Sequence, residues 1–197
     1  MIAPGPHKGS SGSDHRRNQP KSWMCGMRWV KEEPLFTELL TEAHECIFVD
    51  SRRKPTDLRR LIFDDVALRR PEFACLLQTL LGLSGDSKCY YLVLSPDPVH
   101  YFHRQFNKYP LLEIDYGDSN ESYLAFLNED PGGSPADAVG INWWACVILP
   151  PSRKWFSHLL RSANDNGGHL WIPRDWAERV IEWHPYLRVE PGGNGID

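Results

Sequence analysis

The sequence predicts a single mixed α/β domain, of the α/β or alternatively the α+β class, with a mixed sheet of about five short strands flanked by helices. Three observations lead to this prediction. The chain has 197 residues, close to the usual size of one domain. Hydrophobic residues make up 41% and charged residues 24%, which is ordinary for a globular protein. Apolar runs of strand length also alternate with segments of helical period, as in a sheet covered by helices.

The two ends of the chain are predicted to lie outside this domain. Residues 1–22 contain mostly Gly, Ser, Pro, His and basic side chains, so they bury too little apolar surface to offset the entropy of ordering. We expect a disordered N-terminal tail at 1–22, a globular domain at 23–188 and a flexible C-terminal tail at 189–197. The N-terminal tail carries a charge of +3, so the formal charge of −4 for the whole chain leaves −7 on the rest.

The first half of the domain is predicted to contain helices and two buried strands. The apolar period favours a helix over 29–45, and the apolar run at 46–50 is typical of a short buried strand. Residues 54–82 are predicted to be helical in two pieces, the second beginning at Pro71, because proline suits the first position of a helix. Residues 89–95 are apolar or aromatic almost throughout, which indicates a strand covered on both faces.

The middle of the chain is predicted to add two helices and one strand. A helix is expected to begin at the Ser-Pro-Asp-Pro motif and to cover 95–107. Residues 111–116 alternate in polarity like a strand. Residues 119–127 are predicted to form a helix capped by Ser119 or Asn120, because short polar side chains satisfy the free N–H groups at a helix start.

The last part of the chain is predicted to alternate strand and helix twice. Apolar runs indicate strands at 142–149 and 168–173. Large apolar side chains at helical spacing indicate helices at 152–163 and 174–183. The inward stripe of the last helix is expected to consist of Trp176, Val180 and Trp183.

The composition argues against membrane insertion, secretion and nucleic-acid binding. The longest apolar run, 143–149, is far shorter than the 18 or so residues that cross a bilayer, and no secretory signal is visible at the start. The five cysteines are widely spaced and odd in number, which favours free thiols in a reducing compartment. We therefore predict a cytoplasmic protein that does not act at a membrane. Nucleic acid is not expected as a partner either, because nearby acidic residues offset the basic doublets at Arg52, Arg59 and Arg69.

The sequence contains no motif that identifies an enzyme. His100 and His103 are one helical turn apart and could reach a common metal, but two ligands do not make a site, so no metal and no cofactor is predicted. Ser95 follows a strand as a nucleophile could, yet it lacks the glycines of a nucleophile elbow, and no catalytic residue is assigned. A cysteine nucleophile would require Cys25 to meet His44 or His169 in space. The alternative function is an enzyme of unrecognised class with its site at strand ends near Ser95, His100 and His103.

An acidic segment carries the main functional hypothesis. Between residues 109 and 152 the chain has no Lys or Arg but seven acidic residues, and such a field attracts basic proteins. We predict a small acidic binding protein, for example an inhibitor or immunity-type protein that masks a basic partner. The predicted partner-binding residues are Glu113, Asp115, Tyr116, Asp118, Glu121, Tyr123, Glu129 and Asp130. The competing interpretation is a solvated acidic edge that only aids solubility.

Overall fold

The computed structural model of the protein describes residues 27–52, 57–94, 107–128, 145–160 and 167–189. The strands in these residues are β1 (Arg28–Trp29), β2 (Leu58–Asp64), β3 (Lys88–Leu94), β4 (Leu111–Asp115), β5 (Ala145–Leu149), β6 (Phe156–Leu159), β7 (Gly167–Pro173) and β8 (Arg188–Val189). The α-helices are α1 (Glu33–Arg52), α2 (Pro71–Ser84), α4 (Asn120–Leu127) and α5 (Ala177–Trp183). The short 3-10 helices η1 (Asp65–Arg69) and η3 (Arg174–Trp176) precede α2 and α5.

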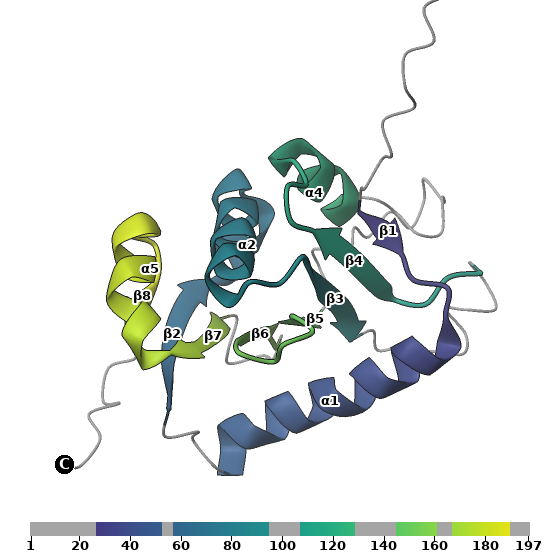
Figure 1. Ribbon diagram of the computed structural model, residues 1–197, viewed down its shortest axis with the longest axis horizontal. Coiled ribbons are helices and arrows are strands. Elements are labelled where there is room, and N and C mark those ends of the chain that lie inside the picture. Colours follow the sequence, from purple (N-terminus) through teal and green to yellow (C-terminus); the bar gives the residue numbers. More distant parts are fainter. Residues whose placement is uncertain (1–26, 53–56, 95–106, 129–144, 161–166, 190–197) are drawn as a thin grey trace, which may run out of the picture.

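The strands form one sheet in the order β1-β4-β3-β5-β6-β7-β2-β8. Figure 1 shows α1 running across one face of this sheet, while α2, α4 and α5 cover the other. The predicted mixed α/β class is therefore confirmed. The predicted mixed sheet of about five strands is wrong, because the described residues form eight strands and all of their pairings are antiparallel.

Two apolar cores lie on the two faces of the sheet, and the central strands contribute to both. In β3, Tyr91 and Val93 face the core beneath α2, α4 and α5, whereas Tyr90 and Leu92 face the core beneath α1. All four side chains are buried, as predicted for a strand covered on both faces. Three further strands lie close to their predicted positions, namely β4, β5 and β7.

Helix α2 lies at the centre of the layer of helices that covers one face. It begins at Pro71 as predicted. Proline suits this position because the first N–H of a helix has no partner within the helix, so its absence costs no hydrogen bond. It ends at Ser84 rather than at Gly82. Gly85 closes it in the left-handed conformation (φ 74°), and the Gly85 N–H donates to the carbonyl of Leu81 at 2.9 Å.

Residues 46–50, predicted as a strand, belong to α1 instead. Phe36, Leu39 and Ala43 of α1 are buried against the sheet at helical spacing, and no Gly or Pro follows them to end the helix before residue 46. An apolar run of five residues fits a strand and a buried helix turn equally well. The predicted strand is therefore wrong, because this apolar run continues helix α1.

Residues 58–64, predicted to be helical, form β2, which pairs along its whole length with β7. Leu61 and Phe63 point into the core beneath the layer of helices, as alternate residues of a strand do. The misleading signal comes from Leu58, Leu61 and Ile62. Their i, i+3, i+4 spacing also fits the face of a helix.

The segment 152–163, also predicted to be helical, contains strand β6. Trp155 and Leu159 both enter the core beneath the layer of helices, whereas Phe156 enters the core beneath α1. The spacing of four between Trp155 and Leu159 is a multiple of the strand period of two. A pair at i and i+4 therefore cannot distinguish the two structures.

The final helix, predicted over 174–183, is divided into η3 and α5. Val180 is buried as predicted, and Trp176 is packed against the core but only partly buried. Trp183 is 54% exposed, so its predicted inward position is wrong. Because η3 turns more tightly than an α-helix, a single helical projection places the later residues on the wrong side.

Some predictions lie outside the described residues. They include the N-terminal tail at 1–22, the C-terminal tail at 189–197 apart from Val189, and nearly all of the helix predicted over 95–107, which contains Ser95, His100 and His103. Among the helices that are described, none is both long enough and apolar enough to cross a membrane.

Candidate functional site

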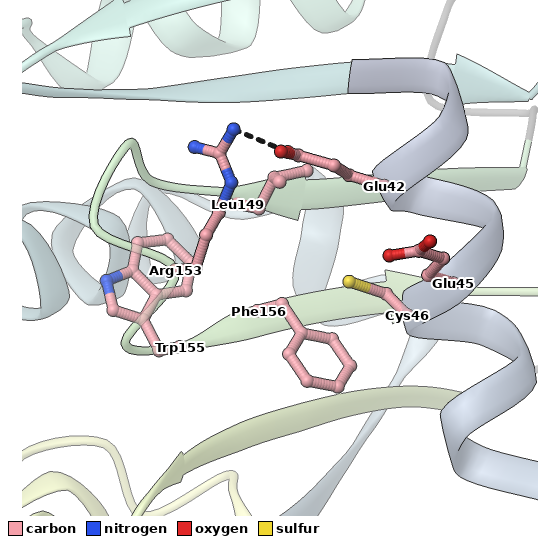
Figure 2. Close-up of a pocket in the computed structure, with 7 residues that line it drawn as sticks. All are labelled: Glu42, Glu45, Cys46, Leu149, Arg153, Trp155 and Phe156. Carbon is pink, nitrogen blue, oxygen red and sulfur yellow. Dashed lines mark ion pairs between the residues drawn. The ribbon is translucent and has the colours of Figure 1, made fainter. Parts of the chain in front are cut away.

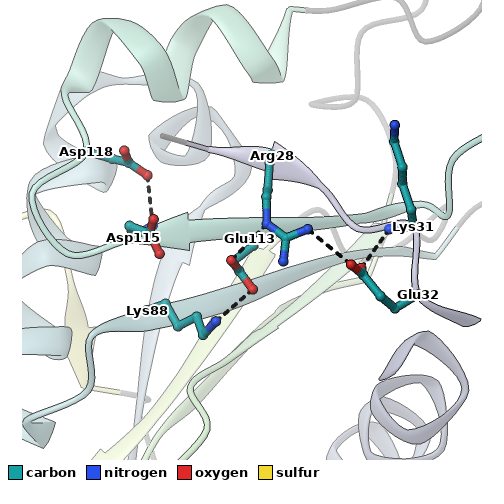
Figure 3. A network of polar contacts seen from close by, with 7 residues as sticks. All are labelled: Arg28, Lys31, Glu32, Lys88, Glu113, Asp115 and Asp118. Atoms are coloured by element: carbon teal, nitrogen blue, oxygen red, sulfur yellow. Dashed lines mark hydrogen bonds and ion pairs between the residues drawn. The ribbon is translucent and has the colours of Figure 1, made fainter. Parts of the chain in front are cut away.

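Glu113, the first of the predicted partner-binding residues, is buried in β4 between two cations. Its carboxylate accepts from Arg28 Nε at 3.1 Å and from Lys88 Nζ at 2.9 Å, as Figure 3 shows. The hydrogen bond to Glu113 raises the pKa of Lys88. Arg28 lies in β1 and Lys88 in β3, so Glu113 ties both neighbouring strands to β4. A carboxylate that is neutralised and buried in this way contributes little to an outward-facing acidic surface.

Tyr123 is also inside the protein. Its side chain is almost completely buried, its ring stacks near that of Phe73, and its hydroxyl donates to the carbonyl of Leu68 at 2.9 Å. This hydrogen bond fixes α4 to the segment before α2. Tyr123 therefore packs in the core in this structure. The predicted residues Glu129 and Asp130 lie outside the described residues.

The turn that joins β4 to α4 brings together the other four predicted residues, which are Asp115, Tyr116, Asp118 and Glu121. We call residues 115–121 the β4–α4 turn. The Asp118 carboxylate accepts the N–H of Asp115 at 2.8 Å, and the Asp118 N–H donates to the carbonyl of Asp115 at 3.1 Å. Ser119 then caps α4 by accepting the N–H of Ser122 at 3.1 Å, so the predicted helix is confirmed with Ser119 as its cap.

Neighbouring elements hold the β4–α4 turn at two points. Gln78 of α2 donates from Nε2 to the carbonyl of Asp115 at 3.1 Å, and its Oε1 accepts the N–H of Gly117 at 2.6 Å. The N–H of Tyr116 donates to the carbonyl of Ser87 at 2.7 Å. Gly117 has φ 98°, a backbone conformation that residues other than glycine rarely adopt. The backbone of the turn is thus fixed before any partner arrives.

Tyr116 projects from this fixed turn and is 60% exposed, the highest value among the large apolar side chains in the described part of the chain. Its ring passes over α2 at Gly82, where a methyl group would lie 3.8 Å from its Cε2 and Oη atoms. A large exposed aromatic side chain on a rigid backbone is unusual for a residue with only a structural role.

The three carboxylates of the β4–α4 turn are not neutralised by ion pairs. Asp115, Asp118 and Glu121 form none within the described residues, in contrast to Glu113. Burial raises the pKa of Asp118, and the charge of Asp115 raises it further. Hydrogen bonds from its own backbone and from Ser119 lower the pKa of Glu121, which is therefore ionised at neutral pH. The turn consequently carries acidic residues on both sides of Tyr116 in the sequence.

The sequence pattern did not indicate the residues that neutralise Glu113 or that hold the β4–α4 turn. Gln78 lies 39 positions before Gly117, with which it bonds, and Arg28 lies 85 positions before Glu113. Neither pair has a local motif. The one available signal is the alternation of side chains along β4. Leu112 and Ile114 face the core beneath α2, α4 and α5, so Glu113 lies on the opposite face of the sheet, the face that α1 covers.

A pocket of about 300 Å³ between α1 and the β5–β6 connection is a second candidate site. Figure 2 shows its lining residues, which are Glu42, Glu45, Cys46, Leu149, Arg153, Trp155 and Phe156. Arg153 forms an ion pair with Glu42 across it. Burial, with a further contribution from Glu42, raises the pKa of Cys46 to about 11, so the thiol stays protonated at neutral pH and is a poor nucleophile. This pocket therefore lacks an activated cysteine.

The remaining candidates from the sequence do not assemble into a site in the described residues. No group of three His, Cys, Asp or Glu side chains is close enough there to hold a metal ion. His44 is exposed on α1, and Cys25, its hypothetical partner, lies outside the described residues. Comparison of the chain with protein-family models, curated proteins and solved structures finds no match.

Proposed function

We propose that this protein is a small acidic binding protein that uses the β4–α4 turn to engage a basic protein partner, as an inhibitor or immunity-type protein does when it masks a cationic surface. The observation that carries this proposal is Tyr116, which is 60% exposed on a turn whose backbone is held by Gln78 and Ser87. The acids Asp115, Asp118 and Glu121 provide the charge around it.

The rigidity of the turn favours binding over a purely solvated edge. Ordering a loop on association reduces affinity, because the lost conformational freedom must be offset by new contacts. Here Asp115, Tyr116, Gly117 and Asp118 each donate their N–H to a partner within the protein. Tyrosine itself loses little entropy when it is immobilised, and it is enriched among the residues that dominate binding energy.

The charge distribution favours a basic partner over a neutral or acidic one. Residues 23–197 carry a formal charge of −7 once the +3 of residues 1–22 is removed from the total of −4. Asp118 and Glu121 form no ion pair within the described residues and retain their negative field, whereas Lys88, which is bonded to Glu113, also interacts with the charge of Asp115. A field of one sign steers an oppositely charged partner and raises its association rate.

Affinity capture with matched aromatic variants tests this proposal. Proteins retained from lysate by the wild type at low salt should be lost with Tyr116→Ala, because truncating an aromatic anchor costs about 2 kcal/mol or more, roughly 30-fold in affinity. Trp183→Ala is the matched control, since Trp183 is 54% exposed on a different helix, α5. It should retain the same proteins as the wild type.

The identity of the retained proteins is part of the result. They should be basic, and high salt should release them, because screening weakens attraction between exposed charges. Equal retention by the wild type and Tyr116→Ala would contradict the proposal. So would retention that depends on Tyr116 but involves only acidic proteins.

A further inference from the structure

A pocket of about 390 Å³ lies between the first half of α2 and the segment that follows α5. This volume falls within the range of small-molecule sites. Its lining residues are Ala67, Arg70, Glu72, Cys75, Trp183, His184, Pro185 and Tyr186. None of them belongs to the β4–α4 turn, so the pocket is separate from the proposed protein-binding site.

The hydrogen bonds around His184 define which of its ring nitrogens carries the proton. His184 Nε2 lies 3.1 Å from Thr79 Oγ1. The Thr79 hydroxyl has one proton, and it donates that proton to the carbonyl of Cys75 at 2.9 Å. Thr79 Oγ1 must therefore accept from His184, so Nε2 is protonated. Burial lowers the pKa of His184, which keeps the ring neutral.

The other nitrogen, His184 Nδ1, is then a hydrogen-bond acceptor. It has no partner among the described residues, and it is not one of their fully enclosed side-chain atoms that lack a partner, although His184 as a whole is only 6% exposed. Acceptors in such positions are normally satisfied by protein, water or ligand. Because Nε2 is directed to Thr79 on α2, Nδ1 is the polar ring atom that remains available to an occupant of the pocket.

Two aromatic side chains line the pocket together with His184, and each has a contact that helps to hold it in place. Tyr186 packs at 72° to the ring of His184 with 6.0 Å between centroids, and its hydroxyl donates to the carbonyl of Glu72 at 3.1 Å. The Arg179 guanidinium lies over the Trp183 ring, 5.8 Å from its centroid. Trp183 nevertheless remains 54% exposed. A fixed but uncovered indole at the edge of a pocket is suited to stacking on a flat ligand.

We propose that this pocket binds a small planar aromatic molecule that donates an N–H or O–H hydrogen bond to His184 Nδ1 and stacks on Trp183. Indoles and phenols are the ligand class that meets both requirements. The donor bonds to an acceptor that has no protein partner among the described residues, and the ring covers apolar surface on Trp183, Pro185 and Tyr186.

Paired probes test the two requirements separately on the whole chain. Phenol and indole should shift the amide NMR signals of residues around the pocket, whereas anisole and N-methylindole, which lack the donor, should bind about tenfold more weakly. Trp183→Ala should weaken all four probes. Tyr116→Ala is the matched control for an exposed aromatic residue outside the pocket and should leave the binding of all four unchanged.

His184→Phe provides a second test of the donor. Phenylalanine keeps a ring at this position but has no nitrogen that could accept a hydrogen bond, and the Thr79 hydroxyl keeps its bond to the carbonyl of Cys75. Phenol should then bind no better than anisole, while the affinity for anisole stays the same. The proposal is overturned if phenol and anisole bind the wild type equally, if the shifts fall outside the pocket, or if none of the probes causes shifts. The comparison of probes on the wild type remains decisive even if His184→Phe does not fold.

Discussion

Replacing Trp155 by alanine is expected to lower the free energy of unfolding by about 3–5 kcal/mol, because the substitution removes a large buried side chain and leaves a cavity that the surroundings fill only in part. Trp155 has no exposed surface and belongs to the core beneath the layer of helices. It stands just before β6, so the cavity would open beside the centre of the sheet. Urea unfolding followed by circular dichroism measures the change.

Trp183→Ala is the control for this prediction. It removes the same side chain from a position that is 54% exposed, so the free energy of unfolding should change by less than about 1 kcal/mol. If both substitutions cost the same, the placement of β6 and of α5 in this fold would be wrong. The comparison also tests whether Trp183 lies at the surface rather than in the core.

Gly168→Ala is expected to destabilise the protein by about 1–3 kcal/mol or more, because the new methyl group collides with a buried ring. Gly168 of β7 lies opposite Phe63 of β2, and a Cβ at this position would lie 2.1 Å from the Phe63 ring atoms Cε2 and Cζ. Phe63 has little room to move, since its ring packs against Phe73 at 5.2 Å between centroids. Chemical denaturation provides the measurement.

Gly82→Ala should have the opposite sign. Gly82 lies in the exposed part of α2, where a methyl group would meet the Tyr116 side chain at an ordinary distance of 3.8 Å. Alanine in place of glycine within a helix stabilises by roughly 0.5–1 kcal/mol. A loss of stability with Gly82→Ala, or none with Gly168→Ala, would contradict the packing described for these two positions.

The fold class was predictable because several segments carry an unambiguous local pattern. Residues 89–95 form an apolar run of strand length that contains two tyrosines and a valine, residue types favoured in strands, and Pro71 marks the start of α2. The segments that were predicted wrongly carry spacings common to both structures. Trp155 and Leu159 fit a helix and a strand alike, and tertiary pairing decides between them.

The candidate site was predictable only as a charged region. Composition indicates an acidic segment, but it does not show that Glu113 is neutralised, because Arg28 and Lys88 reach it through strand pairing. The burial of Tyr123 likewise depends on how α4 packs on α2. The sequence contains no local signal for the contact between Gln78 and the β4–α4 turn.

The central claim is that the charge on the β4–α4 turn attracts a basic partner, and the association rate of a captured partner tests it most directly. The double variant Asp118→Asn with Glu121→Lys changes the charge of the turn by three units. Asparagine keeps an oxygen that can accept the N–H of Asp115, so the turn should remain folded. Glu178→Gln with Glu182→Lys makes the same total change on α5 and serves as the matched control.

Stopped-flow association at several salt concentrations gives the deciding measurement. The proposal predicts that the variant of the turn associates more slowly at low salt and shows a flatter salt dependence, while the α5 control stays close to the wild type. Equal slowing by both double variants would show that the net charge of the protein, and not the position of the charges on the turn, sets the association rate. An association rate at low salt that is unchanged in the variant of the turn would contradict the claim and leave these carboxylates as a solubilising edge.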